Sequence, residues 1–306
     1  MIFHFFKTKK SVDYCSGGII KYVKFNPTYE CLEKAMKEDI NSYGKEVKIN
    51  WIEILSVLAV KYGDEFKKYK ESDITDIVKN LNEKKTAEKL AKNKKNYDYY
   101  LEAYTAILSG FLGTYKDKNN EEKYGLKVYS PIPNGYYFTH GDDFGNSRTF
   151  GFKRPHLGHD LMALTGTPVI AVESGNVEIM GWNRYGGWRI GIRSFDKKRY
   201  YYYAHLRKNR PYHVDLKENQ PVQAGQVIGY VGRTGYSDKE NTNNIDKPHL
   251  HIGLQLVFDE SQKECDNEIW LNFYEITKLL EKNKVSVIRN SETKEFYLVT
   301  NLSQTN

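Results

Sequence analysis

Histidine and aspartate side chains gather in three short motifs of this 306-residue chain. Five of them could do chemistry together: His156, Asp160, His205, His249 and His251. The chain has only 8 histidines, so four at these positions is a marked concentration. Neutral imidazole and carboxylate are ligands of Zn2+, and three protein ligands with one open position is the catalytic arrangement. The motifs contain no cysteine, which argues against a closed structural zinc site.

His249 and His251 are two positions apart at the start of an alternating apolar run. Such alternation predicts a β-strand, on which residues two apart project from the same face. Both imidazoles can therefore reach one centre. The spacing alone leaves open which of the two would bind a metal.

His156 and Asp160 are four positions apart, a spacing that could place them on one face of a helix. Pro155 and Gly158 argue against a helix here, because proline and glycine both destabilise helix interiors. We therefore predict an irregular turn that enters a strand.

His205 ends an aromatic run that begins at Arg199 and has high strand propensity. If the alternation of a strand continues through this histidine, Tyr203 and Tyr201 share its face. The run then places His205 at the end of a strand whose tyrosines could line a substrate groove.

Six stretches of the sequence occur in the order found in one enzyme family: residues 156–161, 166–177, 203–206, 222–229, 232–235 and 248–251. Through these motifs, residues 151–257 resemble the catalytic domain of the lysostaphin/LytM-type zinc metallopeptidases. Enzymes of that family hydrolyse peptide bonds of bacterial peptidoglycan.

The resemblance implies that His156, Asp160 and His251 bind one Zn2+ per chain, and that His205 and His249 flank the reacting water. It implies a zinc-dependent endopeptidase that acts on peptidoglycan peptides in cell wall remodelling or lysis. The two histidines would accept the proton of water, stabilise the oxyanion and help to protonate the leaving amine. The chain lacks the His-Glu-x-x-His motif of many other zinc peptidases, so a histidine pair must replace the glutamate base.

The principal alternative is a catalytically inactive relative that serves as a binding or assembly module in a division or sporulation complex. Degenerate members of the family typically lose one or more of the five polar residues. This chain keeps all five, which favours an active enzyme.

Two further histidines lie near the motifs. The family usually has an apolar residue at the position of His159, so we expect a packing or supporting role for it rather than a catalytic one. His140 could indicate a second metal site, but the run from Thr139 to Asp143 is more typical of a polar turn.

Short strand-like runs separated by glycine turns predict an antiparallel sheet: residues 169–172, 176–181, 188–193, 199–205, 227–231 and 249–257. The fold class expected from the resemblance is α+β, with a LytM-like β domain related to the biotinyl/lipoyl barrel architecture. A carrier protein of that architecture is a third hypothesis, with lysines in the turn 194–198. The turn lacks the flanking methionines of such carriers, and a carrier would leave the histidines unexplained.

The remaining sequence predicts helices around this domain. Residues 28–115 show helical apolar spacing, and 269–280 suggest a C-terminal helix. We expect a helical N-terminal domain over 1–127, the peptidase domain over 128–285, and a polar tail over 286–306.

The net charge is +7, which favours an anionic polymer such as peptidoglycan with its acidic attachments. No nucleic-acid-binding motif is present, and no apolar run is long enough to span a bilayer. An extracytoplasmic location follows from the expected function, although residues 1–10 do not resemble a signal peptide or a membrane anchor. Oligomeric state is not encoded in any motif.

We expect the substrate groove to be lined by Tyr201, Tyr203, the loop 232–237, and the segments near Trp182 and Tyr185. The polar run 238–247 lengthens a loop that is short in the family. It therefore predicts a reshaped cleft and an altered preference among peptide bonds.

Overall fold

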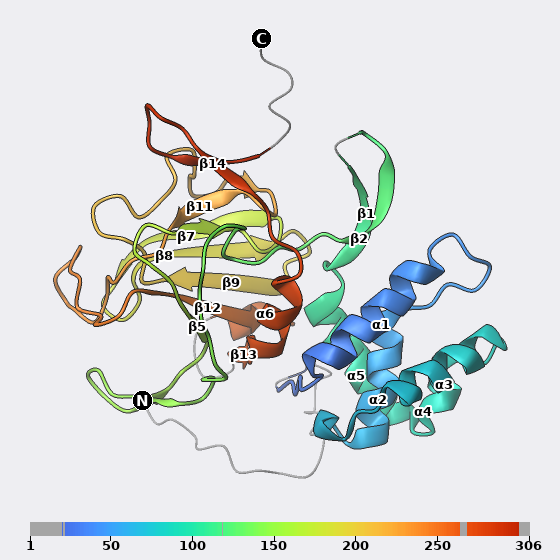
Figure 1. Cartoon of the computed structure of the whole chain (residues 1–306). Coiled ribbons are helices and arrows are strands. Elements are labelled where there is room, and N and C mark those ends of the chain that lie inside the picture. Colours follow the sequence, from blue (N-terminus) through green and yellow to red (C-terminus); the bar gives the residue numbers. More distant parts are fainter. Residues whose placement is uncertain (1–19, 21, 118, 264–267, 300–306) are drawn as a thin grey trace. The chain divides into compact units, whose positions relative to one another are not determined.

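The computed structural model describes residues 20, 22–117, 119–263 and 268–299 (Figure 1). The described residues form two compact units, one within 20–107 and 255–271 and the other within 108–254 and 272–299. The domain boundary expected between residues 127 and 128 stays a prediction. The expectations for residues 1–10 lie outside the described residues.

The first unit is helical. Its elements are α1 (Tyr29–Ser42), α2 (Trp51–Tyr62), η1 (Phe66–Lys68), α3 (Glu71–Asn82), α4 (Ala87–Ala91), α5 (Lys94–Leu108), η2 (Glu260–Gln262) and β13 (Ile269–Leu271). The Asn50 side chain accepts a hydrogen bond from the Ile52 amide where α2 begins, and Gly63 ends that helix with a left-handed φ of 60°. Helix α2 packs against α1, α3 and α4 and buries Ile54 and Leu55 completely. The expected helical region is confirmed.

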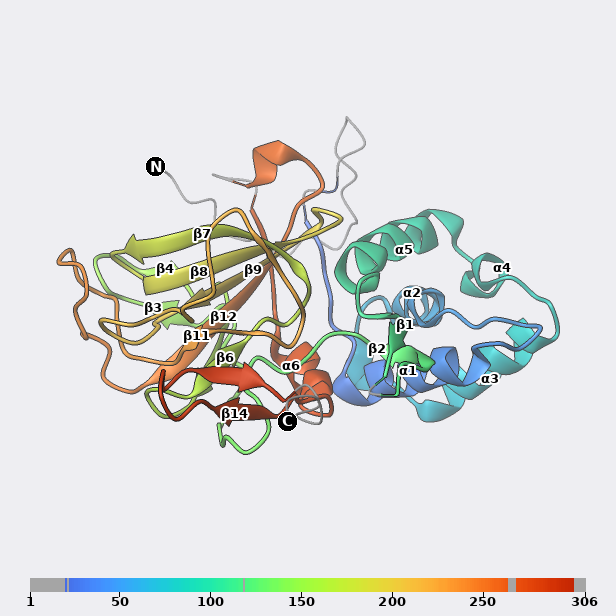
Figure 2. The ribbon, with the colours of Figure 1, turned by 90° about the horizontal axis from the view of Figure 1, so that it is seen from above.

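The second unit contains a twisted sheet with the strand order β10-β7-β8-β9-β12, and β5 pairs with β12 (Figure 2). These strands are β10 (Pro221–Val222), β7 (Gly175–Asn183), β8 (Gly187–Ser194), β9 (Arg199–Ala204), β12 (His249–Leu256) and β5 (His159–Met162). The pairs β10–β7, β7–β8, β8–β9 and β5–β12 are antiparallel. The predicted fold class, a helical N-terminal region followed by a mostly antiparallel β domain, is confirmed.

Alternation along the strands builds the core of this unit. Ile192 of β8 pairs with Tyr201 of β9, and Ile190 pairs with Tyr203. All four side chains are fully buried. Their burial fixes the register, because a slip by one residue would turn this apolar face to solvent.

Smaller elements surround the sheet: β1 (Leu112–Lys116) with β2 (Glu122–Leu126), β3 (Ser147–Arg148) with β4 (Arg154–Pro155), β6 (Pro168–Ile170) with β11 (Val227–Tyr230), α6 (Tyr274–Leu280), and β14 (Val287–Arg289) with β15 (Phe296–Leu298). The predicted C-terminal helix is α6, while 269–271 is a strand. The polar tail expected from residue 286 contains the β14–β15 hairpin as far as the structure describes it. Phe296 packs against Tyr230, whose hydroxyl donates to the buried carboxylate of Glu295, and these contacts fold the segment back.

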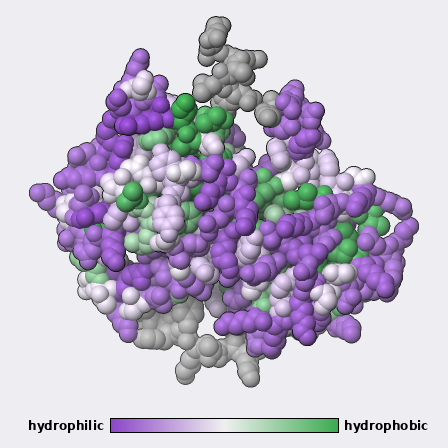
Figure 3. All heavy atoms as spheres, viewed as in Figure 1, coloured by the Kyte–Doolittle hydropathy of each residue, from purple (hydrophilic) through white to green (hydrophobic). Residues whose placement is uncertain are grey.

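Hydrophilic residues cover most of the face seen in Figure 3, with smaller apolar patches between them. This surface agrees with the mean hydropathy of −0.68. Among the described residues, no helix combines the length and apolarity that a bilayer crossing requires.

Candidate active site

The register of β5 on β12 brings the central motifs together. Asp160 of β5 pairs with His251 of β12, and His249 pairs with Met162. Since residues two apart on a strand share a face, His249 and His251 both project toward the Asp160 carboxylate. His156 follows the short strand β4, so the predicted irregular turn into a strand is what the structure has.

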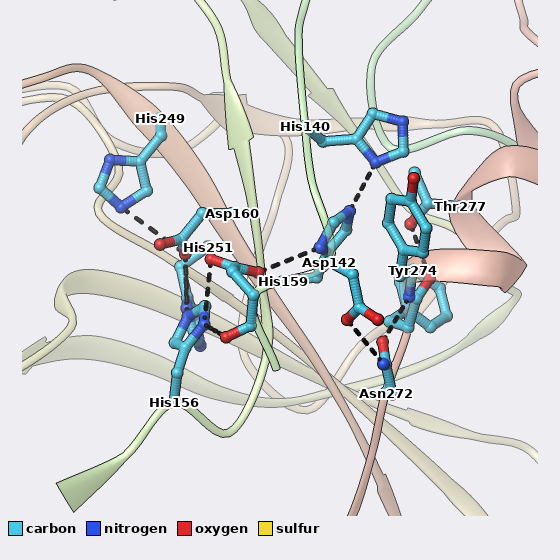
Figure 4. A network of polar contacts seen from close by, with 12 residues as sticks. His140, Asp142, His156, His159, Asp160, His249, His251, Asn272, Tyr274 and Thr277 are labelled. Atoms are coloured by element: carbon cyan, nitrogen blue, oxygen red, sulfur yellow. Dashed lines mark hydrogen bonds and ion pairs between the residues drawn. The ribbon is translucent and has the colours of Figure 1, made fainter. Parts of the chain in front are cut away.

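Three donor atoms converge at this point. His156 Nε2 lies 3.0 Å from Asp160 Oδ1, His251 Nδ1 lies 3.0 Å from the same oxygen, and the two nitrogens are 2.8 Å apart. These residues form a cluster with ligand atoms that suit a metal ion, and we call it the donor triad. Figure 4 shows the three side chains pointing toward one another, with His249 beside them.

A second layer of contacts holds the donor triad in place. Arg148 Nη2 donates to Asp160 Oδ2 at 2.9 Å, which leaves Oδ1 facing the histidines. His156 Nδ1 lies 3.1 Å from the Asp143 carbonyl oxygen and 3.2 Å from its carboxylate. An imidazole that donates through Nδ1 has its lone pair on Nε2, directed at the cluster.

The charges around the donor triad suit a cation. Burial lowers the pKa of His156, but hydrogen bonds to Asp143 and Asp160 outweigh burial and raise it to about 9. Burial raises the pKa of Asp160, while hydrogen bonds from His156 and His251 hold it well below its usual range. The raised pKa of His156 reflects the two carboxylates next to it, and the ionised Asp160 supplies a negative charge to the donor triad.

His205 and His249 lie next to each other with ring centroids 4.8 Å apart. His205 Nδ1 is 2.9 Å from the Thr234 carbonyl oxygen, and His249 Nδ1 is 2.9 Å from that of Lys247. A carbonyl oxygen can only accept, so each Nδ1 carries a proton, and in a neutral ring the lone pair is then on Nε2. Burial, with His249 and His251 close by, lowers the pKa of His205 well below its ordinary value, so this imidazole is neutral.

The expectation that Tyr201 and Tyr203 share the face of His205 and line a groove is wrong. Both tyrosines are fully buried in the core. The Tyr201 hydroxyl donates to the Glu173 carboxylate, and the Tyr203 hydroxyl accepts from the Val172 amide. His205 follows the end of β9 with a left-handed φ of 59°, which breaks the alternation of the strand. Tyr202 is the ring near the site, with its centroid 5.9 Å from that of His251.

Gly158 explains why the motif around His156 needs a glycine. A Cβ at this position would lie 2.4 Å from Cε1 and 2.5 Å from Nε2 of His251. Any side chain here would push the His251 ring away from Asp160.

His159 and His140 form a buried network beside the donor triad (Figure 4). His159 is fully buried, with Nδ1 3.3 Å from Asp143 Oδ1 and Nε2 2.8 Å from His140 Nδ1. His140 Nε2 is 2.9 Å from Glu281, at the end of α6. The supporting role expected for His159 matches these contacts, and the turn at His140 takes part in the same network.

Sequence reasoning missed Asp143 and Arg148, the two residues that hold His156 and Asp160. Neither residue belongs to a sequence motif whose spacing indicates a metal site or a catalytic site. They become visible only when β3 pairs with β4 and brings residues 143–148 next to His156.

The sequence model of peptidase family M23 matches residues 154–264. The chain contains a peptidase family M23 domain. This match argues against the carrier-protein hypothesis. The matched residues include the whole donor triad, His205 and His249.

Two curated relatives match the region of the M23 domain. The L-Ala–D-Glu endopeptidase of Bacillus subtilis (strain 168) is 37% identical over 159 residues, which are 52% of this chain and 47% of that protein. Lysostaphin of Staphylococcus simulans is 41% identical over 98 residues, 32% of this chain and 17% of that protein. The chain thus spans about half of the first relative and a smaller share of the second.

A solved structure of lytM from Ruminococcus gnavus ATCC 29149 has the same fold. It superposes with a TM-score of 0.58 at 22% identity, covering 85% of this chain and 89% of that one. The similarity therefore extends beyond the M23 domain to the fold of most of the described chain.

Proposed function

We propose that this chain is a zinc-dependent endopeptidase that hydrolyses peptide bonds of bacterial peptidoglycan. The observation that carries the proposal is the convergence of the donor triad with two histidines beside it, whose Nδ1 atoms lie against backbone carbonyl oxygens. The name of the first relative, an L-Ala–D-Glu endopeptidase, supports the same type of reaction.

The donor triad fits zinc. Its donor separations of 2.8–3.0 Å approach the roughly 3.3 Å expected between ligands on a tetrahedral ion with bonds near 2.0 Å. We assign His156, Asp160 and His251 as the ligands. Bound zinc would polarise the scissile carbonyl and make water more acidic.

His205 and His249 are the proposed catalytic residues. In the neutral ring, the Nε2 atom of either histidine can accept the proton of the attacking water while the water oxygen bonds to the carbonyl carbon. The protonated imidazole then donates to the oxyanion, and it delivers the proton to the amide nitrogen when the C–N bond breaks. The pair thereby does the work of the glutamate base that this chain lacks.

The substrate implies an extracytoplasmic site of action at the cell wall. The net charge of +7 suits a polymer with many carboxylates and phosphates.

The test combines metal analysis with wall digestion. Purified protein should contain about one zinc per chain and clear a zymogram of purified cell walls. Chelation should abolish clearing and zinc should restore it. Zinc-loaded protein that binds walls without releasing new amino termini would refute the enzyme and support the inactive binding module.

A further inference from the structure

Aromatic and arginine side chains form a cluster on the surface beside His205. Its members come from three separate segments, the β3–β4 region, the β7–β8 turn and the loop after Gly235, and we call it the arginine–aromatic cluster: Phe150, Phe152, Arg154, Arg184, Tyr185 and Tyr236. Phe152 is 43% exposed, so the cluster reaches solvent. A purely structural core would not place these rings at the surface.

The rings of the cluster make a continuous platform. Phe150 stacks on Tyr236 with centroids 4.9 Å apart and planes within 7°. Phe150 and Phe152 both meet the Tyr185 ring edge-on, at 6.1 and 6.0 Å. Four rings from three segments therefore fix one another.

Two guanidinium groups lie on this platform. Arg154 Cζ is 4.6 Å from the centroid of Tyr185, and Arg184 Cζ is 5.3 Å from the same centroid. A guanidinium that stacks on a ring keeps in-plane N–H groups available at its edges, in a geometry that matches a carboxylate.

The charge of these arginines is only partly neutralised. Arg184 pairs with Asp238 at 3.3 Å, but the Asp238 side chain is 78% exposed, so the pair is weak. Arg154 donates through Nη1 to the Phe150 carbonyl oxygen, and in the described part of the chain it has no ion pair. Positive charge on a preformed platform is suited to an anionic ligand.

Backbone hydrogen bonds fasten the cluster next to the proposed catalytic histidine. The Tyr236 ring centroid is 5.9 Å from that of His205. The Ser237 amide donates to the Arg184 carbonyl oxygen at 3.0 Å, and Asn244 Nδ2 donates to the Tyr236 carbonyl oxygen at 2.6 Å. The loop after Gly235 thus holds one ring of the platform beside His205.

We propose that Arg154 and Arg184 form a subsite that binds a free carboxylate on the peptide residue next to the bond that is cut. This inference rests on the proposed endopeptidase function and narrows it. The preferred substrate is an acidic peptide, and an uncharged bridge of glycines is a poor one.

The test compares two short peptides that differ only in a carboxylate or a carboxamide next to the scissile bond. The zinc-loaded full chain should cleave the acid with a kcat/KM about 10- to 100-fold above that of the amide, as expected when a charged hydrogen-bonded pair is gained. Arg154→Gln and Arg184→Gln should reduce this ratio toward one, and Arg154→Lys should restore part of it.

Lys153→Gln is the matched control, because it removes the same charge from an exposed neighbour of Arg154 and should keep the wild-type ratio. Melting temperatures of all variants separate misfolding from lost recognition. Equal rates for acid and amide in the wild type, or an equal loss on both peptides in Arg154→Gln, would overturn the subsite.

A calorimetric binding measurement with the same peptides separates this inference from the proposed function. If the wild type cleaves neither peptide, the endopeptidase proposal fails. Selective binding of the acid that is lost in Arg154→Gln would still support the subsite, and equal binding of acid and amide would still overturn it.

Discussion

The helical unit and the M23 domain bury polar groups in different ways. In the helical unit, Asp39 accepts from the Trp51 amide and Ser42 exchanges hydrogen bonds with the backbone of Ile49, so each group serves the local backbone. In the M23 domain, the Nδ1 atoms of His205 and His249 each contact a backbone carbonyl oxygen, and among the described residues the Nε2 atoms make no such backbone contact. The buried polar groups of the helical unit stabilise its fold, whereas those of the M23 domain have a nitrogen that could bind a ligand. Substitutions in the two regions should therefore affect different properties, stability in the first and metal binding or hydrolysis in the second.

The largest effect is expected from Asp160→Ala. It removes a proposed zinc ligand and also the carboxylate to which Arg148 donates a hydrogen bond. Zinc content should fall sharply and wall hydrolysis should be lost. Asp215→Ala, on an exposed carboxylate, is the control. A variant at residue 160 that retains one zinc per chain by elemental analysis would show that the ligand assignment is wrong.

His205→Ala and His249→Ala should retain zinc and lose about 100- to 1,000-fold in kcat, because each removes a group proposed to act in the transition state. The measurement is kcat on a soluble peptide with zinc content determined in parallel. Lys208→Ala, at an exposed position, should match the wild type. If His249→Ala loses zinc while His251→Ala keeps it, the roles within that pair are reversed.

Gly158→Ala should weaken zinc binding by about 10- to 100-fold, the range seen when the support of a metal ligand is disturbed. The added Cβ would lie 2.4 Å from the His251 ring and displace it. Competition with a chromogenic chelator measures the affinity. Gly141→Ala is the control, because a Cβ there meets nothing within 4 Å. Unchanged affinity at position 158 would contradict the close packing of His251.

The smallest effect is expected in the helical unit, from Asp64→Asn. Asp64 is 4% exposed and accepts hydrogen bonds from Asn26 and Tyr104. Burial raises its pKa to about 6. A raised carboxyl pKa contributes stability that is complete below about pH 4 and is lost as the pH rises through 6.

Asp64→Asn should therefore flatten the fall in unfolding free energy between pH 4 and 7.5, by at most about 3 kcal/mol. Urea unfolding followed by circular dichroism at both pH values measures this. Zinc content and peptide hydrolysis should not change. If the pH dependence of the unfolding free energy is the same in Asp64→Asn and the wild type, Asp64 is not the group that causes it.

The sequence was sufficient to predict the strands that position the chemistry, because alternation and glycine turns are local signals. It also pointed to the five polar side chains that the structure brings together. It could not reveal Asp143, Arg148 or Tyr202, since their places depend on strand pairing and on the left-handed backbone at His205. The β14–β15 hairpin was missed for the same reason, because the partner that orders it, Tyr230, is distant in the chain.

The pairing of Asp160 with His251 across β5 and β12 has a consequence for assembly. Backbone hydrogen bonds of the sheet set the spacing of these two side chains, so folding alone brings the ligand atoms of the donor triad together. A metal ion that binds here would find its ligands already close together. We expect the chelated protein to keep its far-ultraviolet spectrum, and its melting temperature to rise with zinc concentration by simple mass action.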